Sequence, residues 1–485
     1  MKVYIEQENQ VLEAAQGENL LQVLRSAGFG LDAPCGGKGT CGKCKVLVNG
    51  TEQLACQTAI EEDIQVQLPQ QARTEILTGG AALQVKPDGK DDYVLAFDVG
   101  TTTVVAYLLC GKTGKVLAQD SCVNPQTQYG ADVISRIQYA MNTDADAMAA
   151  CIRKALSNLT CSAAQKAGIE AEKITAVSLV GNTAMHHLLL GIDPKPLTTP
   201  PYMPNVSHAL ELKAKDYLPV GENAVLRILP NIAGFVGADT VGCLVATEFD
   251  KLEEMTLMID IGTNGEMVLG NRDGYLACST AAGPAFEGAK IQCGMRGADG
   301  AVDHVYLEND KISYSVIGGG EAKGLCGSGL LDLTAVLLQT EDIDESGRME
   351  EKIFTLPESA VTLSQKDVRE VQLAKAAIRA GIELMCKKRG IRPEDIQKVY
   401  LAGAFGNYLD PASACAIGMI PPCLQDHIQP IGNAAGMGAR ACALSREMFR
   451  YSAELAQKAQ FLELASMPEF NDCYVDCLLF EEDED

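Results

Sequence analysis

Alternating apolar and polar residues at the start of the chain predict a small sheet with one helix. Residues 2–14, KVYIEQENQVLEA, alternate in two short runs and indicate a β-hairpin. Residues 18–28, ENLLQVLRSAG, carry apolar positions at helical spacing and predict a short amphipathic helix that ends at Gly28. The runs KVLV and TEQLA flank Asn49-Gly50 and predict a second hairpin, because Asn-Gly is the strongest two-residue hairpin signal.

Two longer apolar runs repeat one pattern about 160 residues apart. VLAFDVGTTTVVAYL begins at Val94 and LMIDIGTNGEMVL begins at Leu257, and both predict a strand, an Asp-x-Gly-Thr turn and a second strand. Glycine lets the backbone approach a phosphate, and the amides and hydroxyls that follow can donate hydrogen bonds to it. An Asp at the strand end can hold Mg²⁺ through water. The repeat therefore predicts a duplicated domain whose halves face each other across a polyphosphate.

Further segments extend this pattern. Residues 371–390 read as a helix, and residues 396–409 read as a strand followed by a tight turn at Gly403-Ala404-Phe405-Gly406. KGLCGSGLLDL, residues 323–333, is a glycine loop that opens a helix, either beside the nucleotide or as a tight helix entry without a ligand. Residues 281–305 are glycine-rich and read as loops near the cleft with no assigned chemistry.

LVGNTAMHHLLLG, residues 179–191, falls between the two repeats. Asn182 and Thr183 are its candidate site residues, of which we take Asn182, and the superfamily resemblance given below implies that either could orient an attacking water. His186 and His187 read as packing and surface residues rather than ligands.

Four cysteines are grouped in the pattern C-x5-C-x2-C-x11-C, and they are Cys35, Cys41, Cys44 and Cys56. The predicted hairpin between the last two returns Cys56 to the side of Cys44, so four thiolates converge. The loop also carries four glycines, whose amides can turn toward sulfur and tune an iron–sulfur cluster. A Cys₄ zinc site remains the alternative, although such sites usually show two C-x2-C pairs and this segment has one. The pattern favours a [2Fe–2S] cluster.

Composition excludes several function classes. The net charge of −24 argues against nucleic acid and against anionic membrane surfaces as partners. No stretch reaches 18 uncharged apolar residues, and MKVYIEQENQ lacks a signal-peptide core. These two observations indicate a cytoplasmic protein, in which disulfides are unlikely. Most of the eighteen cysteines are scattered singly and read as small buried residues.

The chain of 485 residues is long enough for several domains. We expect a cluster domain over 1–68, a linker over 69–92, a two-lobed domain over 93–472 and a C-terminal segment over 473–485 that ends in a disordered acidic tail. The linker has no clear period, so the cluster domain is expected to be mobile.

These segments resemble known folds. Hairpin, helix, cysteine loop and hairpin resemble the α+β β-grasp [2Fe–2S] ferredoxin domain. The repeated motifs resemble the phosphate-1, phosphate-2 and adenosine motifs of the actin/sugar-kinase/chaperone (ASKHA) ATPases, which implies a duplicated α/β ASKHA domain that binds ATP and Mg²⁺. The residues that match are Asp98, Gly100, Thr101 and Thr102 for the first motif, Asp260, Gly262, Thr263 and Asn264 for the second, Gly403 and Ala404 for the third, and Gly324 and Gly327 for the glycine loop.

The whole chain resembles one family that joins these two domains, the ATP-dependent reductive activators of corrinoid proteins. NPQTQYGADVISRI, GPAFEGA, GLCGSGL and LAGAFGNYL all look like that family. The resemblance implies that an external low-potential donor reduces the cluster, which returns cob(II)alamin of a methyltransferase system to cob(I)alamin. It implies catalytic roles for Asp98, Asp260 and Asn182. Larger members carry an extra small domain where this chain has only the linker, which leaves a homodimer open.

The implied reaction needs an energy source. Each 100 mV of shortfall costs about 2.3 kcal/mol for one electron, and plant-type clusters lie near about −400 mV. ATP could close that gap by moving a two-lobed domain. The alternatives are an ASKHA-fold kinase with an accessory ferredoxin, a dehydratase-type activator, and a non-enzymatic redox-sensing scaffold.

Overall fold

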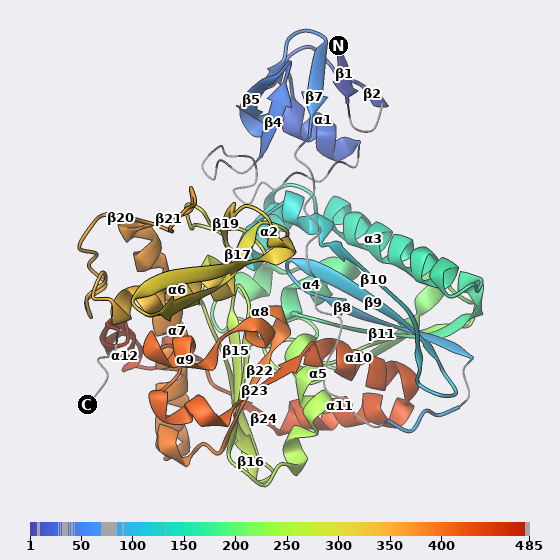
Figure 1. Ribbon diagram of the computed structural model, residues 1–485. Helices are drawn as coiled ribbons and strands as arrows, with labels where there is room; N and C mark the ends of the chain where they lie inside the picture. The colour runs from blue at the N-terminus through green and yellow to red at the C-terminus, as the bar shows by residue number, and fades with distance from the viewer. Residues whose placement is uncertain are drawn as a thin grey trace.

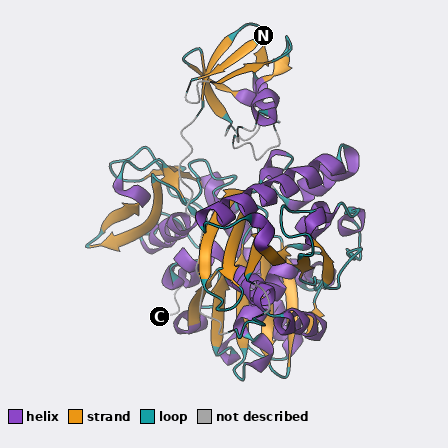
Figure 2. Cartoon of the chain, turned by 90° about the vertical axis from the view of Figure 1, so that its right-hand side faces the viewer, coloured by secondary structure: helices purple, strands orange, loops and turns teal. Residues whose placement is uncertain are grey.

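The computed structural model describes residues 1–6, 10–27, 44–68, 85–89, 92–130 and 132–480, and the single positions 29, 31, 37, 39 and 42. A small domain built from the first 68 residues stands apart from a larger body in Figure 1 and in the rotated view of Figure 2. The larger body contains two six-stranded sheets with helices packed around them. No helix in the described part of the chain is long and apolar enough to cross a membrane.

The N-terminal domain is a five-stranded sheet with one helix against it. Leucines of the helix pack with alternate residues of the strands, such as Val3, Ile5 and Val66. The strands, in spatial order, are β2 (Gln10–Glu13), β1 (Lys2–Ile5), β7 (Ile64–Gln67), β4 (Lys45–Val48) and β5 (Thr51–Leu54). The remaining elements are β3 (Glu18–Asn19), β6 (Ala59–Ile60) and α1 (Leu20–Ser26).

Both predicted hairpins of this domain are present. Strands β1 and β2 pair antiparallel, and so do β4 and β5. Asn49 and Gly50 have φ of 49° and 79°, the pair of positive values that a type I′ turn requires. The predicted helix end at Gly28 lies outside the described residues.

The first lobe is built on a sheet that begins as an antiparallel meander and continues with parallel strands. Strands β8, β9 and β10 pair antiparallel, and β11 and β13 then lie parallel to β8. In spatial order the strands are β10 (Val116–Val123), β9 (Thr103–Cys110), β8 (Tyr93–Val99), β11 (Ile174–Gly181), β13 (Val225–Ile228) and β12 (Leu210–Lys213). The helices of this part of the chain are α2 (Val133–Asn142), α3 (Ala145–Lys166), α4 (Thr183–Leu190) and α5 (Ala238–Thr247).

The second lobe repeats that topology. Strands β14, β15 and β16 form the meander, and β22 and β23 follow as the parallel strands. In spatial order the strands are β23 (Ile428–Gly432), β22 (Lys398–Ala402), β14 (Thr256–Ile261), β15 (Gly265–Asn271), β16 (Gly274–Thr280) and β24 (Ala459–Phe461). The duplication predicted from the two Asp-x-Gly-Thr segments is therefore present, with β8 and β14 in equivalent central positions.

Smaller sheets and seven helices complete the described part of the second lobe. The smaller strands are β17 (Ala301–Glu308), β18 (Lys311–Val316), β19 (Gly324–Leu325), β20 (Ile353–Thr355) and β21 (Thr362–Ser364). The helices are α6 (Gly327–Gln339), α7 (Gln365–Arg389), α8 (Gly403–Tyr408), α9 (Pro411–Ala416), α10 (Ala434–Leu444), α11 (Arg446–Lys458) and α12 (Phe470–Asp476).

The two lobes are joined by a close crossing of α5 and α10. Helix α10 follows β23 of the second sheet but packs on β8 and β11 of the first. Side-chain atoms added at Gly438 would lie 2.1 Å from the carbonyl oxygen of Gly242, so the two helices meet backbone to backbone. A core of residues from both sheets, among them Tyr107 and Met258, surrounds this crossing. The crossing therefore joins the cores of the two lobes.

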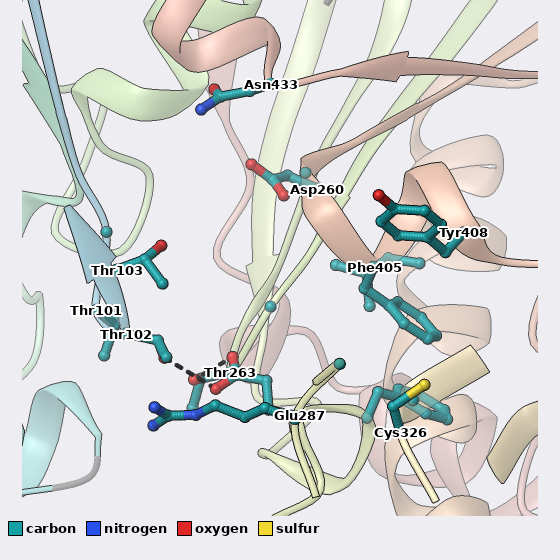
Figure 3. A pocket seen from close by; sticks show the side chains of 18 of the residues that line it. Thr101, Thr102, Thr103, Asp260, Thr263, Glu287, Cys326, Phe405, Tyr408 and Asn433 are labelled. Carbon is teal, nitrogen blue, oxygen red and sulfur yellow. Dashed lines mark hydrogen bonds between the residues drawn. The ribbon is translucent and has the colours of Figure 1, made fainter. Parts of the chain in front are cut away.

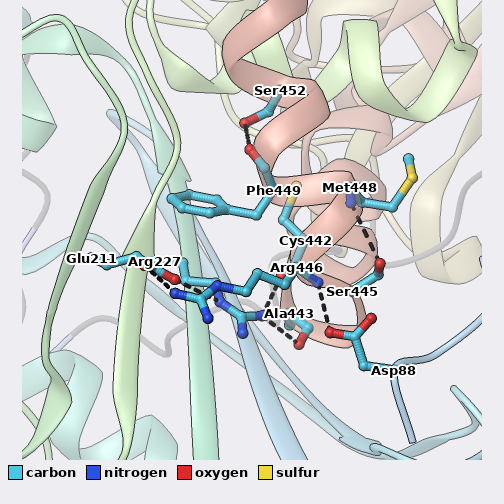
Figure 4. Close-up of polar contacts among 10 residues, drawn as sticks. All are labelled: Asp88, Glu211, Arg227, Cys442, Ala443, Ser445, Arg446, Met448, Phe449 and Ser452. Atoms are coloured by element: carbon cyan, nitrogen blue, oxygen red, sulfur yellow. Dashed lines mark hydrogen bonds and ion pairs between the residues drawn. The ribbon is translucent and has the colours of Figure 1, made fainter.

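The end of the predicted linker is fixed to the larger body. The Asp88 amide donates to the Leu444 carbonyl at 3.0 Å. The Arg446 amide donates to the Asp88 carboxylate at 2.9 Å (Figure 4). Val85 packs against the core between the lobes. Residues 85–89 therefore belong to the two-lobed domain, which shortens the linker, while residues 69–84 lie outside the described residues.

The same corner ties α10 and α11 to the edge of the first sheet. Arg227 of β13 donates to the Cys442 carbonyl at 3.0 Å, and Arg446 pairs with Glu211 of β12 at 2.7 Å (Figure 4).

The predicted C-terminal boundary at 472 is wrong. Helix α12 runs across it, and Phe480 is 2% exposed within the core of the second lobe. The Phe480 amide also donates to the Glu345 carbonyl at 2.8 Å. The folded domain therefore extends to residue 480, and residues 481–485 lie outside the described residues.

Candidate functional site

A cavity of about 350 Å³ lies between the two lobes, and both Asp-x-Gly-Thr turns line it. Figure 3 shows Thr101, Thr102 and Thr103 on one side and Asp260 and Thr263 on the other. Its volume is within the range of small-molecule sites, about 300–1,000 Å³.

Each of the two turns is closed by a backbone hydrogen bond from its glycine amide. The Gly100 amide donates to the Thr103 carbonyl at 2.9 Å, and the Gly262 amide donates to the Asn264 carbonyl at 2.9 Å. The first turn reverses the chain over residues 100–103 and the second over residues 262–264. Asp98 and Asp260 lie at equivalent strand ends. The predicted site residues of both turns therefore line one cavity.

Four half-buried carboxylates line the deep part of the cavity. Burial raises the pKa of Asp98 and of Asp260 to about 6, and Asp98 adds to the rise at Asp260. Burial also raises the pKa of Asp239 to about 7 and that of Glu266 above its usual range, and the neighbouring carboxylates reinforce both shifts. A cation bound among these four half-buried carboxylates would relieve their mutual repulsion.

No three carboxylate, imidazole or thiol groups within the described ranges converge closely enough to hold a metal directly. This arrangement fits Mg²⁺, which keeps several waters and binds through one or two carboxylates and substrate phosphates.

Asn182 connects the first turn to α4. Its side-chain amide donates to the Thr101 hydroxyl at 2.8 Å, and its carbonyl oxygen caps α4 at the Met185 amide at 3.0 Å. Asn182 lines the cavity as predicted. His186 and His187 are 1% and 0% exposed, so the expectation that they include a surface residue is wrong.

An aromatic group closes the other end of the cavity. The Phe286 and Phe405 rings are stacked with centroids 5.0 Å apart, and Tyr408 lies beside Phe405 (Figure 3). Side-chain atoms at Gly327 would meet the Phe405 ring at 2.8 Å, so this glycine allows the ring to pack on the helix entry. A flat apolar surface of this kind suits a nucleobase.

Two details of the third motif and the glycine loop differ from expectation. Gly403 to Gly406 form the start of helix α8 rather than only a tight turn. Gly403 has φ of 81°, and side-chain atoms there would lie 2.6 Å from an Asp260 oxygen. Gly324 does not line the cavity and instead packs against the Cys293 carbonyl. The Ala404 side chain lies outside the described residues.

Several lining residues escaped the sequence analysis, namely Asp239, Glu266, Glu287, Arg296 and Asn433. Glu287 accepts hydrogen bonds from the Thr102 hydroxyl at 3.0 Å and from the Thr263 hydroxyl at 2.8 Å (Figure 3). One carboxylate therefore bridges the turns of both lobes. The signals for it were its place in the glycine-rich segment 281–305 and in the GPAFEGA segment that resembles the family.

Arg136 of α2 supports the first turn from behind. It is fully buried, and its guanidinium donates to the Thr101 carbonyl at 2.6 Å and to the Gly130 carbonyl at 2.9 Å. Burial lowers its pKa to about 10. The buried guanidinium of Arg136 therefore fixes the direction of the Thr101 carbonyl in the first turn.

Two of the four grouped cysteines are described, and their surroundings fit a cluster. Cys44 and Cys56 are 1% and 6% exposed at the foot of the β4–β5 hairpin, where the Ala55 amide donates to the Cys44 carbonyl at 2.8 Å. Gln57 donates to the Cys56 sulfur at 3.7 Å. The described cysteines form no disulfides, and Cys35 and Cys41 lie outside the described residues. The residues present therefore suit a metal–sulfur group, with Gln57 as a donor to its sulfur ligand.

Comparisons with protein families cover nearly the whole chain. Residues 3–66 match the 2Fe-2S iron-sulfur cluster binding domain, residues 93–252 match the RACo middle region, and residues 254–485 match the C-terminal domain of RACo, the ASKHA domain. The first match favours a [2Fe–2S] cluster over zinc. The predicted fold class, a ferredoxin domain followed by an ASKHA domain, is confirmed.

Individual proteins agree with these matches. The corrinoid activation enzyme RamQ of Eubacterium limosum is 37% identical over 82% of this chain and 73% of its own length. The [Co(II) methylated amine-specific corrinoid protein] reductase of Methanosarcina barkeri is 30% identical over 55% of this chain and 53% of its own length. The solved structure of a reductive activator for corrinoid, iron–sulfur protein superposes with a TM-score of 0.74 at 29% identity and covers 99% of this chain and 98% of that one. The chain belongs to the family of corrinoid activation enzymes, the reductive activators of corrinoid proteins.

Proposed function

We propose that this enzyme uses ATP to drive a low-potential electron from its [2Fe–2S] domain to the cobalt(II) of a corrinoid protein and so regenerates cobalt(I) for a methyltransferase system. The observation that carries the ATP part is the cavity between the lobes, where two equivalent Asp-x-Gly-Thr turns and a pair of stacked rings face one space. The family supports the corrinoid substrate.

ATP would lie with its phosphates between the two turns. The amides near Gly100 and Gly262 and the hydroxyls of Thr101, Thr102 and Thr263 are the donors. Asp98 and Asp260, together with Asp239 and Glu266, would hold Mg²⁺ through water, because their raised pKa values report a place that favours a cation. Phe405 and Tyr408 offer a surface for the base. Asn182 would orient the attacking water.

The four cysteines would hold the cluster, which supplies one-electron transfer when bound. This chain contributes the buried thiols of Cys44 and Cys56 and the Gln57 donor to the Cys56 sulfur. The electron itself comes from an external low-potential donor, and we place the reaction in the cytoplasm, where thiols remain reduced.

Coupling would arise from the relative movement of the lobes. Both turns need to contact the same phosphates, so nucleotide binding would change how far the lobes close about the α5–α10 crossing. A two-state movement of this kind can act on a docked corrinoid protein, and its free energy is limited by the difference in ATP affinity between the two states.

The test is anaerobic mixing of the reconstituted enzyme, a reductant and a cobalt(II) corrinoid protein, with and without Mg-ATP, followed by visible spectroscopy. We expect the cobalt(I) absorption band only with ATP and release of inorganic phosphate. Equal reduction without ATP would contradict the proposal, and transfer of phosphate to a small molecule would favour a kinase.

A further inference from the structure

Glu287 holds hydrogen-bond donors from the turns of both lobes. Its two carboxylate oxygens accept hydrogen bonds from the hydroxyls of Thr102 and Thr263, at 3.0 Å and 2.8 Å, and these threonines come from the turns of opposite lobes (Figure 3). A carboxylate and a phosphate are both anions that accept from hydroxyl donors. The two anions cannot share these hydroxyls, because like charges in a half-buried site repel.

Arg296 is the complementary group. It is the one basic residue among the described residues that line the cavity, where six carboxylates also lie, at Asp98, Asp239, Asp260, Glu266, Glu287 and Asp303. Its guanidinium makes no hydrogen bond or ion pair with any residue that the structure describes. A guanidinium suits phosphate because its N–H groups match two phosphate oxygens at once.

Glu287 and Arg296 flank one closed loop. Side-chain atoms at Gly288 would lie 2.5 Å from the Met295 carbonyl oxygen, and those at Gly294 would lie 2.4 Å from the Gly288 carbonyl oxygen. Gly288 also has φ of 75°, which favours glycine. The ends of the loop are thus in backbone contact, so Glu287 and Arg296 are neighbours on one small unit. Both also lie close enough to Arg136 to influence its charge.

We propose that Glu287 and Arg296 form an exchange pair for the terminal phosphate of ATP. When no nucleotide is bound, Glu287 would hold the two threonine hydroxyls and so link the lobes. The terminal phosphate takes those hydroxyls, Arg296 binds the phosphate, and the released Glu287 moves with the loop. The pair would make the site selective for a nucleoside triphosphate over a diphosphate. The inference rests on the proposed binding of ATP between the lobes.

The test is calorimetric titration of the full-length protein with ATP and with ADP. Glu287→Gln removes the negative charge that competes with the terminal phosphate. This variant is expected to bind ATP at least fivefold more tightly, with ADP affinity changed less than twofold. Arg296→Gln is expected to bind ATP at least tenfold more weakly, again with ADP affinity nearly unchanged. Asp303→Asn is the matched control, because it removes one negative charge from the same cavity wall without contacting either threonine, and its ATP affinity should change less than twofold.

The exchange of Glu287 for phosphate and the binding of ATP itself are tested by different outcomes. ATP binding to Glu287→Gln that is equal to or weaker than wild type would overturn the exchange, and so would equal tightening in Asp303→Asn. If Glu287→Gln does not fold, Glu287→Asp decides, because its shorter side chain cannot reach both threonines and should also tighten ATP. A wild-type protein that binds no ATP would overturn the proposed function itself.

Discussion

The Asn433 side chain donates a 2.8 Å hydrogen bond to the Asp98 carboxylate across 335 residues of sequence. Asn433 caps helix α10 at the Gly436 amide and also donates to the Tyr107 hydroxyl at 3.2 Å. The residue that begins the crossing helix between the lobes therefore also touches the central carboxylate of the first turn. The position of α10 and the charge of Asp98 are coupled through one amide.

Replacing Asn433 by Ala should shift the pH dependence of ATP hydrolysis. Burial raises the pKa of Asp98 to about 6. The Asn433 hydrogen bond opposes this rise because it favours the ionised carboxylate. Without this hydrogen bond the pKa of Asp98 rises further. As the pH is lowered, hydrolysis that needs ionised Asp98 is therefore lost at a higher pH than in the wild type. We expect the acid limb to move up by about one unit, measured as the pH profile of phosphate release.

The same change removes a helix cap and should cost about 1 kcal/mol of stability. Ser364→Ala, which removes the cap of α7 away from the cavity, is the control. It should lower the stability without moving the acid limb. An unchanged acid limb in Asn433→Ala would show that the hydrogen bond does not influence Asp98.

Asp98→Ala and Asp260→Ala should each lower Mg²⁺-dependent ATP hydrolysis by at least about 100-fold, because each removes a carboxylate from the proposed ion site. The cluster absorbance should survive, since the cysteines lie in the N-terminal domain. Asp216→Ala, at an exposed position, should hydrolyse ATP normally. Wild-type hydrolysis by either cavity variant would mean that the phosphate turns have been assigned wrongly.

The cysteine assignment predicts two iron and two sulfide per chain. Changing Cys35, Cys41, Cys44 or Cys56 to Ser should reduce or abolish the visible absorbance of the cluster. Cys110→Ser and Cys386→Ser should leave it intact. Metal analysis that finds one zinc and no acid-labile sulfide would contradict the assignment.

Gln57→Leu should make the cluster potential more negative. Gln57 donates to the Cys56 sulfur, and a donor stabilises the more negative, reduced state. A net hydrogen bond of about 1 kcal/mol corresponds to about 40 mV for one electron. Redox titration followed by electron paramagnetic resonance measures the shift, with Gln22→Leu at an exposed position of α1 as the control. A cluster potential equal to that of the control would show that Gln57 does not influence the cluster.

The elements with local signals could be predicted from the sequence, and the contacts between distant segments could not. Asn49-Gly50 and both Asp-x-Gly-Thr turns specify their own conformations, so the hairpins and the duplication follow directly. Asp239 reads as an ordinary acidic residue in the first turn of a helix, and Glu266 as a polar position of a strand. Only the fold brings them to Asp98 and Asp260.

Three errors have similar causes. Two adjacent histidines gave no sign that α4 is buried on all sides. The glycine loop contains three glycines of similar appearance, of which Gly327 lines the cavity and Gly324 packs behind it. The acidic tail concealed Phe480, the buried residue directly before it at the end of the folded domain.

The measurement that tests the central claim most directly is the cobalt(I) absorption band of a corrinoid protein mixed with reductant, ATP and either the full-length protein or its separated parts. The full-length protein should give the band. Residues 1–68 alone should accept an electron but give no cobalt(I), and residues 85–485 alone should bind ATP but reduce nothing. The two parts mixed should work poorly, because the linker keeps the cluster domain at a high effective concentration near the docked partner. Full reduction by residues 1–68 without ATP would contradict the account, since the two-lobed domain would then not be the energy source.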